Sequence, residues 1–264
     1  MRALTGTTQD WPHRVRLRLE PGPGETLDAI CGGVVQVLQR RLGYRFTLDP
    51  VLLAHFAVFE AGAHRGRLLD LGTGCGIIPL VLARRFGRTD ITALELQPGL
   101  FFLAERNVYL NRCEGAVTLV QGDLRHVAET FPASSFGHVL CNPPYRARTA
   151  GQSNLSREKA LARHEIACEL PDVVRAAAYL LVPRGAMCMV YPASRFSELV
   201  SVLRTLQLEP RTVRMVHPRA DRPAKLVLLH AVKGGRADLT VLPPLVVHAD
   251  EEAAFTEEVN AMVG

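Results

Sequence analysis

The hydrophobic pattern of the chain changes period repeatedly from residue 67 onward. Short continuous apolar runs, typical of strands buried on both faces, alternate with segments in which apolar residues recur every three or four positions, as in helices. The predicted strands are Leu68–Leu71, Ile91–Glu95, Val117–Val120, His138–Cys141, Ala186–Tyr191, Arg211–Val216 and Lys225–Val232. The predicted helices are Ile77–Phe86, Pro98–Asn111, Asp172–Leu181 and Ser194–Leu206. This alternation predicts an α/β fold with a mostly parallel seven-stranded sheet and helices on both faces.

The two ends of the chain depart from this alternation. The last two predicted strands are joined by a short polar loop, so we expect them to pair antiparallel at one edge of the sheet. Near the N-terminus, apolar runs at Leu27–Cys31 and Val34–Leu38 flank two glycines, which predicts a β-hairpin. Asp49 and Pro50 then open a helical pattern through Phe59, with Asp49 as the expected N-cap.

The domain organisation follows from these patterns. We predict a lead-in over residues 1–25 and one domain over residues 26–264. That domain divides into an N-terminal hairpin and helix (26–64), a core (65–235) and a C-terminal extension (236–264), in which Thr256 is a predicted helix N-cap.

Composition removes several classes of protein. The 264 residues are 48% hydrophobic and 22% charged, which suits one large packed domain. No apolar run reaches the length that crosses a bilayer, and the N-terminus lacks the apolar core of a secretory signal, so a cytoplasmic protein is expected. Six scattered cysteines show no CxxC spacing and no accompanying histidine cluster; we therefore expect buried thiols and no metal site.

The charge balance favours an anionic partner. The net charge is +5, and basic residues concentrate in two stretches, around residues 146–165 and 211–225. The candidate contacts to nucleic-acid phosphates are Arg146, Arg148, Arg157, Lys159, Arg163, Arg214, Arg219, Arg222 and Lys225. The alternative interpretation of both stretches is an ordinary solvated surface.

A glycine-rich turn follows the first core strand. Asp70 ends that strand, and Gly72, Gly74 and Gly76 allow a tight turn and a close backbone approach to a ligand. Glu95 ends the next strand, where a carboxylate can accept hydrogen bonds from ribose hydroxyls. This half can hold S-adenosylmethionine; a site for NAD and a purely structural turn are the alternatives.

Asp123 ends the third strand region, in Gln121-Gly122-Asp123. Its carboxylate can accept a hydrogen bond from the adenine amino group of a cofactor. It can equally cap the N-terminus of the following helical segment, and the two roles are compatible.

The sequence Asn142-Pro143-Pro144-Tyr145 ends the fourth strand and indicates chemistry on a planar amine. An exocyclic or amide nitrogen is a weak nucleophile, because its lone pair is delocalised. The side-chain carbonyl of Asn142 and the main-chain carbonyl of Pro143 can accept both N–H groups and aim the lone pair at a methyl donor. The prolines stiffen the loop, and Tyr145 offers a ring for stacking. Ordinary turn chemistry is the alternative.

Together these motifs resemble the bacterial tRNA(Val) adenine-N6 methyltransferase family, within the Rossmann-like class I methyltransferases. The resemblance rests on Asp70-Leu-Gly-Thr-Gly-Cys-Gly-Ile-Ile-Pro-Leu80 and Asn142-Pro-Pro-Tyr145, and it extends to Tyr44–Ala54. It implies that S-adenosyl-L-methionine is the cofactor and a base in a tRNA loop the substrate. It also implies that Asp70, Gly72, Gly74, Gly76, Glu95 and Asp123 contact the cofactor, with Phe46 and Asp49 nearby. Asn142, Pro143 and Tyr145 would then hold the target base.

Other functions remain open at this point. A protein glutamine N5-methyltransferase acting on release factors would use the same four-residue motif, although fewer than 70 residues precede the first core strand here. An rRNA guanine-N2 enzyme and a DNA adenine enzyme are further alternatives. A binding module without catalysis is disfavoured by the intact Asn142, Pro143 and Tyr145.

Overall fold

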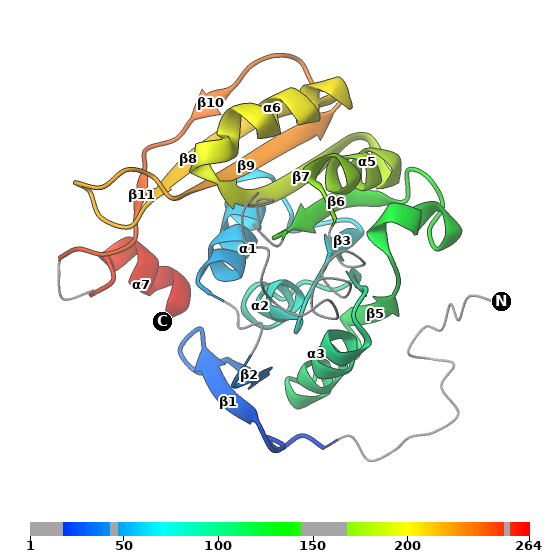
Figure 1. Cartoon of the computed structure of the whole chain (residues 1–264), viewed down its shortest axis with the longest axis vertical. Coiled ribbons are helices and arrows are strands. Elements are labelled where there is room, and N and C mark those ends of the chain that lie inside the picture. The colour runs from blue at the N-terminus through cyan, green and yellow to red at the C-terminus, as the bar shows by residue number, and fades with distance from the viewer. Residues whose placement is uncertain (1–17, 43–46, 144–167, 251–253) are drawn as a thin grey trace, which may run out of the picture.

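The computed structural model describes residues 18–42, 47–143, 168–250 and 254–264 (Figure 1). A single large sheet forms the centre, with strand order β10-β8-β9-β7-β6-β3-β4-β5 and β11 also paired with β8. Its strands are β3 (Leu68–Leu71), β4 (Ile91–Glu95), β5 (Val117–Gln121), β6 (Phe136–Cys141), β7 (Leu181–Pro192), β8 (Leu208–His217), β9 (Leu226–Lys233), β10 (Thr240–Val241) and β11 (Leu245–Val246).

The predicted mostly parallel sheet with an antiparallel edge is confirmed. Strands β3 to β7 pair in parallel, and β9 lies between β7 and β8, antiparallel to both. The sequence did not predict β10 and β11, which add two residues each in parallel to β8. Strands this short have no pattern of their own, because their pairing is set by the neighbouring strand.

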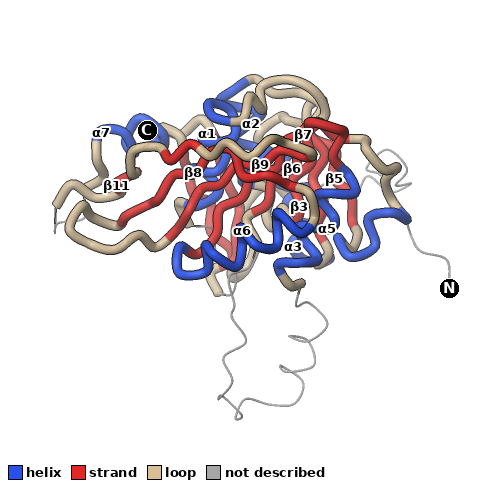
Figure 2. The backbone as a smooth tube through the Cα atoms, turned by 90° about the horizontal axis from the view of Figure 1, so that it is seen from above, coloured by secondary structure: helices blue, strands red, loops and turns tan. Residues whose placement is uncertain are grey.

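Two apolar clusters cover the two faces of the sheet. Figure 2 shows helices on both sides of the strands. Neighbouring residues of a strand point to opposite faces, so Leu140 joins one cluster while Val139 and Cys141 join the other. The first cluster includes side chains of α1 (Asp49–Glu60), α2 (Ile77–Phe86) and α3 (Pro98–Leu110). The second includes those of α5 (Leu170–Leu180) and α6 (Phe196–Thr205). The core strands are thus buried on both sides, as their continuous apolar runs predicted.

Several element boundaries differ from the predicted ones. Helix α1 begins at Asp49 itself, with Leu48 at the N-cap position and no side-chain cap, so the predicted cap is one residue out of place. Helix α5 runs directly into β7, which starts at Leu181 and is twice the predicted length. Thr256 caps α7 (Glu257–Val263) as predicted, accepting a hydrogen bond from the N–H of Val259.

The predicted N-terminal hairpin is present as β1 (Glu25–Ile30) and β2 (Val35–Arg40). It is held on α3 by two asparagine side chains that imitate a neighbouring strand. Asn107 Oδ1 accepts from the N–H of Leu38 at 2.7 Å, and its Nδ2 donates to the Leu38 carbonyl at 3.0 Å. Asn111 exchanges the same pair of hydrogen bonds with Gln36. Asn107 Nδ2 also donates to the carbonyl of Cys75, in the glycine-rich turn, so one side chain joins the hairpin to that turn.

We expect Asn107→Ala to lower the free energy of unfolding by about 2–4 kcal/mol, because buried main-chain groups of Leu38 and Cys75 would lose their partners. Thermal unfolding measures this loss. Asn260→Ala is the control, because Asn260 Nδ2 makes one exposed hydrogen bond to Phe255. Equal stability of the two variants would show that the Asn107 amide does not anchor the hairpin.

Candidate active site

The glycine-rich turn after β3 wraps around the end of β4. The N–H groups of Gly72 and Thr73 both donate to the carbonyl of Leu94 at 2.9 Å. Gly72, Gly74 and Gly76 have φ values of +74°, +61° and +89°, a region that L side chains rarely adopt. A Cβ added to Gly72 would meet nothing within 4 Å, so that glycine is needed for its conformation and leaves space beside the turn.

The Glu95 carboxylate fixes this turn by accepting main-chain hydrogen bonds. Its Oε2 accepts from the N–H of Gly74 at 2.9 Å and its Oε1 from the N–H of Gln97 at 2.8 Å. Burial raises the pKa of Glu95, and those main-chain hydrogen bonds oppose the rise. Each carboxylate oxygen keeps further lone-pair capacity, so the same side chain can accept ribose hydroxyls without releasing the turn.

We expect Glu95→Ala to weaken binding of S-adenosylhomocysteine by tenfold or more, about 1.4 kcal/mol, because both the acceptor and the support of the Gly74 N–H are lost. Isothermal titration calorimetry measures the affinity. Glu95→Gln keeps one acceptor oxygen, and we expect its affinity for S-adenosylhomocysteine to lie between those of the wild-type protein and Glu95→Ala. Unchanged affinity in the alanine variant would mean that the ligand is held elsewhere.

Asp70 is completely buried at the end of β3. Neither carboxylate oxygen has a hydrogen-bond partner among the described residues. Burial raises the pKa of Asp70 to about 7; the Thr73 hydroxyl lies near enough to oppose the shift, without hydrogen-bond geometry, and the charge of Glu95 adds to it. A buried carboxylate without a donor is costly, so packing alone would not favour an acid at this position.

Asp123 is both a cap and one half of an ion pair. It accepts from the N–H of Arg125 at 2.9 Å, which confirms the predicted capping role at η1 (Leu124–Glu129). The Arg125 guanidinium adds contacts to both carboxylate oxygens at 2.5–3.0 Å. Burial would raise the pKa of Asp123, but the hydrogen bonds and charge of Arg125 outweigh it and lower the pKa. Asp123 is therefore ionised and held in one orientation.

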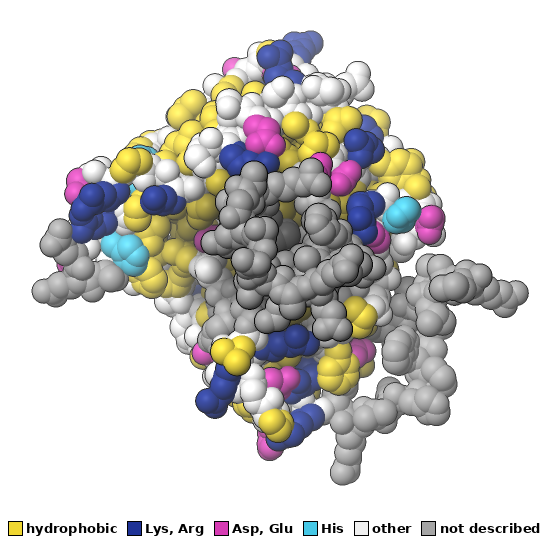
Figure 3. Space-filling model, in the orientation of Figure 1, with side chains coloured by type: hydrophobic (Ala, Val, Ile, Leu, Met, Phe, Trp, Pro, Cys, Tyr) yellow, Lys and Arg dark blue, Asp and Glu magenta, His cyan; other side chains and the backbone are white. Residues whose placement is uncertain are grey.

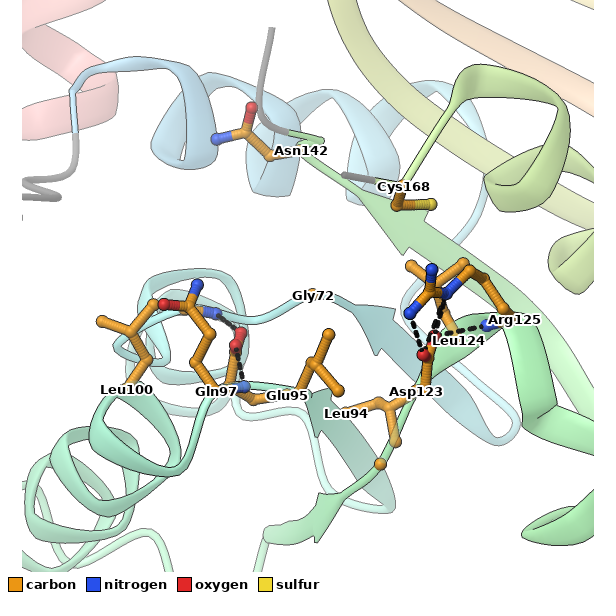
Figure 4. Close-up of a pocket in the computed structure, with 13 residues that line it drawn as sticks. Gly72, Leu94, Glu95, Gln97, Leu100, Asp123, Leu124, Arg125, Asn142 and Cys168 are labelled. Carbon is orange, nitrogen blue, oxygen red and sulfur yellow. Dashed lines mark hydrogen bonds and ion pairs between the residues drawn. The ribbon is translucent and has the colours of Figure 1, made fainter. Parts of the chain in front are cut away.

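One pocket at the carboxyl ends of the parallel strands brings the two predicted halves together (Figure 4). Asn142 and Cys168 lie on one side of it, and Glu95, Gln97 and Asp123 lie on the other. The pocket is lined by Gly72, Gly74, Leu94, Glu95, Leu96, Gln97, Leu100, Gly122, Asp123, Leu124, Arg125, Asn142 and Cys168. This is the place where open α/β sheets bind ligands.

Not every predicted site residue reaches this pocket. Asp70 and Gly76 belong to the turn but do not line the cavity, and neither do Asp49 and Pro143. The residues that lie outside the described ranges are Phe46, Tyr145, Arg146, Arg148, Arg157, Lys159 and Arg163.

The second predicted basic stretch makes contacts within the protein itself. Arg214 forms two hydrogen bonds with Glu258 at 2.7 and 2.9 Å and one with the carbonyl of Pro243, and its side chain is 17% exposed. Arg219 forms two hydrogen bonds with Asp221, and Arg222 approaches the same carboxylate at 3.6 Å. A phosphate bound by Arg214 would compete with Glu258, which already offsets the charge of this guanidinium.

Sequence reasoning missed Gln97, Arg125 and Cys168 as pocket residues. Gln97 and Arg125 each lie two positions beyond a predicted site acid at a strand end, a signal that could have found them. Cys168 follows no such strand, and the pattern of the chain gave no hint of it. Burial raises the pKa of its thiol to about 12, so the Cys168 side chain is neutral.

The described residues contain no group of three or more side chains suited to hold a metal ion. Within the same ranges, no helix has the length and apolar character needed to cross a membrane.

Comparison with known proteins gives consistent similarities. A family model described as methyltransferase small domain matches residues 47–213. A tRNA1(Val) (adenine(37)-N6)-methyltransferase of Aeromonas hydrophila is 31% identical over 195 residues, covering 74% of this chain and 79% of that protein. The Vibrio cholerae enzyme of the same name is 26% identical over 186 residues, covering 70% and 74%. The crystal structure of a predicted O-methyltransferase from Agrobacterium tumefaciens superposes with a TM-score of 0.65 at 24% identity, covering 81% of this chain and 94% of that one; this likeness is one of fold.

Proposed function

Because the chain belongs to the methyltransferase small domain family, we propose that it transfers a methyl group to the N6 atom of an adenine in a tRNA anticodon loop. The observation that carries this proposal is that one pocket is lined by Gly72 and Gly74, by Glu95 and Asp123, and by Asn142. The relatives with the name of a tRNA adenine-N6 enzyme favour adenine over a protein glutamine or an rRNA guanine. We expect the reaction to take place in the cytoplasm.

The residues present fit S-adenosylmethionine. The cofactor carries an amine, and Asp70 has two buried carboxylate oxygens without donors in the described residues. It carries a ribose and an adenine, and Glu95 and Asp123 offer acceptors along the pocket. When bound, it supplies a methyl group on a positively charged sulfur. Leu94, Leu96 and Leu100 give the pocket an apolar wall for the adenine ring.

Asn142 and Pro143 would activate the target amine. The side-chain carbonyl of Asn142 and the main-chain carbonyl of Pro143 accept the two N–H groups, which directs the nitrogen lone pair towards the methyl carbon. No strong base is needed, because the proton can leave after transfer. Loop bases of RNA are unpaired and enter such a pocket at low cost in stacking energy. Tyr145 would stack on the base, and Arg146, Arg148, Arg157, Lys159, Arg163, Arg222 and Lys225 remain candidates for phosphate contacts.

Transfer of a labelled methyl group tests this function. The purified protein is incubated with methyl-labelled S-adenosylmethionine and, in separate reactions, with bulk tRNA, with rRNA or with a release factor. The digested nucleosides and peptides are then identified by mass spectrometry. We expect label in N6-methyladenosine. Label on a release factor with none in RNA would establish the glutamine alternative, and label in N2-methylguanosine of rRNA would establish the guanine alternative.

A further inference from the structure

The hairpin β1–β2 brings arginines to the mouth of the pocket. Strand β2 runs antiparallel to α3, since Gln36 pairs with Asn111 at the end of α3 and Leu38 with Asn107 one turn earlier. Two residues of a strand advance about 6.6 Å and four residues of a helix about 6 Å. Successive hydrogen-bonded positions on β2 and α3 therefore stay opposite one another. Strand β2 therefore ends beside the start of α3, the edge of the sheet where the pocket lies.

Arg40, the last residue of β2, contacts the first turn of α3. A Cβ added at Gly99, in the first turn of α3, would clash with Nη2 of Arg40, so this guanidinium lies directly against that glycine. Gly99 stands between Gln97 and Leu100, which both line the pocket. The end of β2 is thus one side chain away from the pocket rim.

Arginines slightly outnumber carboxylates at this end of the hairpin, where Glu20 is also exposed and Arg18 acts on the charge of Glu25. Arg41 is exposed, and its side chain makes one hydrogen bond in the described residues, from Nε to the carbonyl of Glu25. Arg18 is also exposed and donates to the carbonyl of Pro21. The nearby Glu25 is neutralised by Arg106 at 2.7 Å. Asp28 accepts a hydrogen bond from Gln39 at 2.7 Å. Figure 3 shows Lys and Arg side chains, with Asp and Glu side chains among them, over the lower end of the molecule, where β1, β2 and α3 lie in Figure 1.

This arrangement contrasts with the arginines of the β8–β9 region. There Arg214 and Arg219 already form two hydrogen bonds each with a carboxylate. Arg41 and Arg18, in comparison, form no ion pair with a described residue. Leu42, which follows Arg41, is 86% exposed, an apolar side chain with nothing covering it in the described structure. A guanidinium that is hydrogen-bonded to carbonyl oxygens has no bound carboxylate to offset its charge, so it attracts a phosphate more strongly than one in an ion pair.

We propose that Arg40 and Arg41, with Arg18 beside them, form a contact surface for the phosphate backbone of the RNA whose base enters the pocket. This inference rests on the proposed function, because it assumes an RNA substrate. The charge and exposure of these arginines suit a flexible anionic backbone. The contact of Arg40 with Gly99, between two pocket residues, suits nucleotides adjacent to the target base.

The test is RNA binding by the full-length protein with S-adenosylhomocysteine present, measured by fluorescence anisotropy with a labelled anticodon stem-loop. We expect the double variant Arg40→Glu/Arg41→Glu to weaken binding by tenfold or more at 150 mM salt. The slope of log affinity against log salt should become shallower by roughly 1.5, since two phosphate contacts are lost. Affinity for S-adenosylhomocysteine should stay within twofold.

Arg65→Glu/Arg112→Glu is the matched control. It makes the same change in net charge at exposed residues. These residues precede β3 and β5, near the amino ends of the strands, whereas the pocket lies at the carboxyl ends. We expect its RNA affinity to stay within twofold of the wild type. The milder Arg40→Gln/Arg41→Gln variant covers the case in which charge reversal disturbs folding, and it should weaken binding at least threefold.

Equal RNA affinities of the hairpin variant and the control would overturn the inference. A parallel loss of S-adenosylhomocysteine affinity would also overturn it, because Arg40 would then serve the cofactor. These results differ from a failure of the proposed function, in which the wild-type protein transfers no label to RNA.

Discussion

The Asp70→Asn variant is expected to be more stable than the wild-type protein at pH 8 and yet to bind S-adenosylhomocysteine at least a hundredfold more weakly. The Asp70 carboxylate is fully buried and has no hydrogen-bond donor among the described residues. Burial raises its pKa to about 7, so at pH 8 the folded protein carries an unpaired buried charge. The neutral amide removes that charge, and we expect a gain of about 2 kcal/mol, or roughly 4–8 °C in Tm.

The pH dependence separates this explanation from a simple packing effect. The folded-state pKa of Asp70 lies above its unfolded value of about 4, so the folded protein takes up a proton first as the pH falls. The wild-type protein therefore regains stability between about pH 7 and pH 4, and the advantage of the asparagine variant should shrink from pH 8 to pH 5. An advantage of constant size would contradict the buried-charge account.

The loss of ligand binding has the same cause. We propose the carboxylate as the acceptor for the ligand amine, and an amide would replace half of it with a donor. We expect calorimetry to show at least a hundredfold weaker binding of S-adenosylhomocysteine. Retained affinity would remove Asp70 from the cofactor site.

Asn142→Ala is expected to lower the rate of methyl transfer at least a hundredfold while affinity for S-adenosylhomocysteine changes less than threefold. The side chain of Asn142 lies across the pocket from Glu95 and Asp123, the acids proposed to hold the cofactor (Figure 4). Its loss removes an oriented dipole from the reacting amine and leaves the turn and both acids in place. Single-turnover kinetics with saturating RNA measures the rate.

Two controls make this prediction specific. Arg112→Ala, at the far end of α3, should keep the wild-type rate. Calorimetry on Asn142→Ala checks the cofactor site, and a large loss of affinity there would show that Asn142 acts by supporting the cofactor. A wild-type rate in Asn142→Ala would exclude the residue from the reaction.

Features at the ends of parallel strands could be predicted from the sequence. Glu95 and Asn142 come directly after an apolar run, Asp123 comes three positions after one, and parallel pairing brings such positions to one edge. The hairpin and the antiparallel edge followed in the same way from local glycines and a short polar loop.

Features that depend on a distant partner could not be predicted. The anchor of β2 requires Asn107, which is 69 positions from Leu38 along the chain. Arg214 pairs with Glu258, and its charge alone suggested a free surface. The orientation of Asp123 depends on Arg125, a residue whose side chain could have pointed into solvent. In each case the residue type was visible, but the contact is set by how the elements pack.

The asparagine ladder on α3 also limits how this part of the fold can change in length. Deleting one residue from β2 between Gln36 and Leu38 would turn the amide-facing edge of the strand away from Asn107 or Asn111. Removing two strand residues restores the facing, but the ladder then needs a whole helical turn less in α3. We therefore expect related sequences to tolerate a change of two residues in β2 only when α3 changes by about four residues in the same direction. An alignment of related sequences tests this expectation.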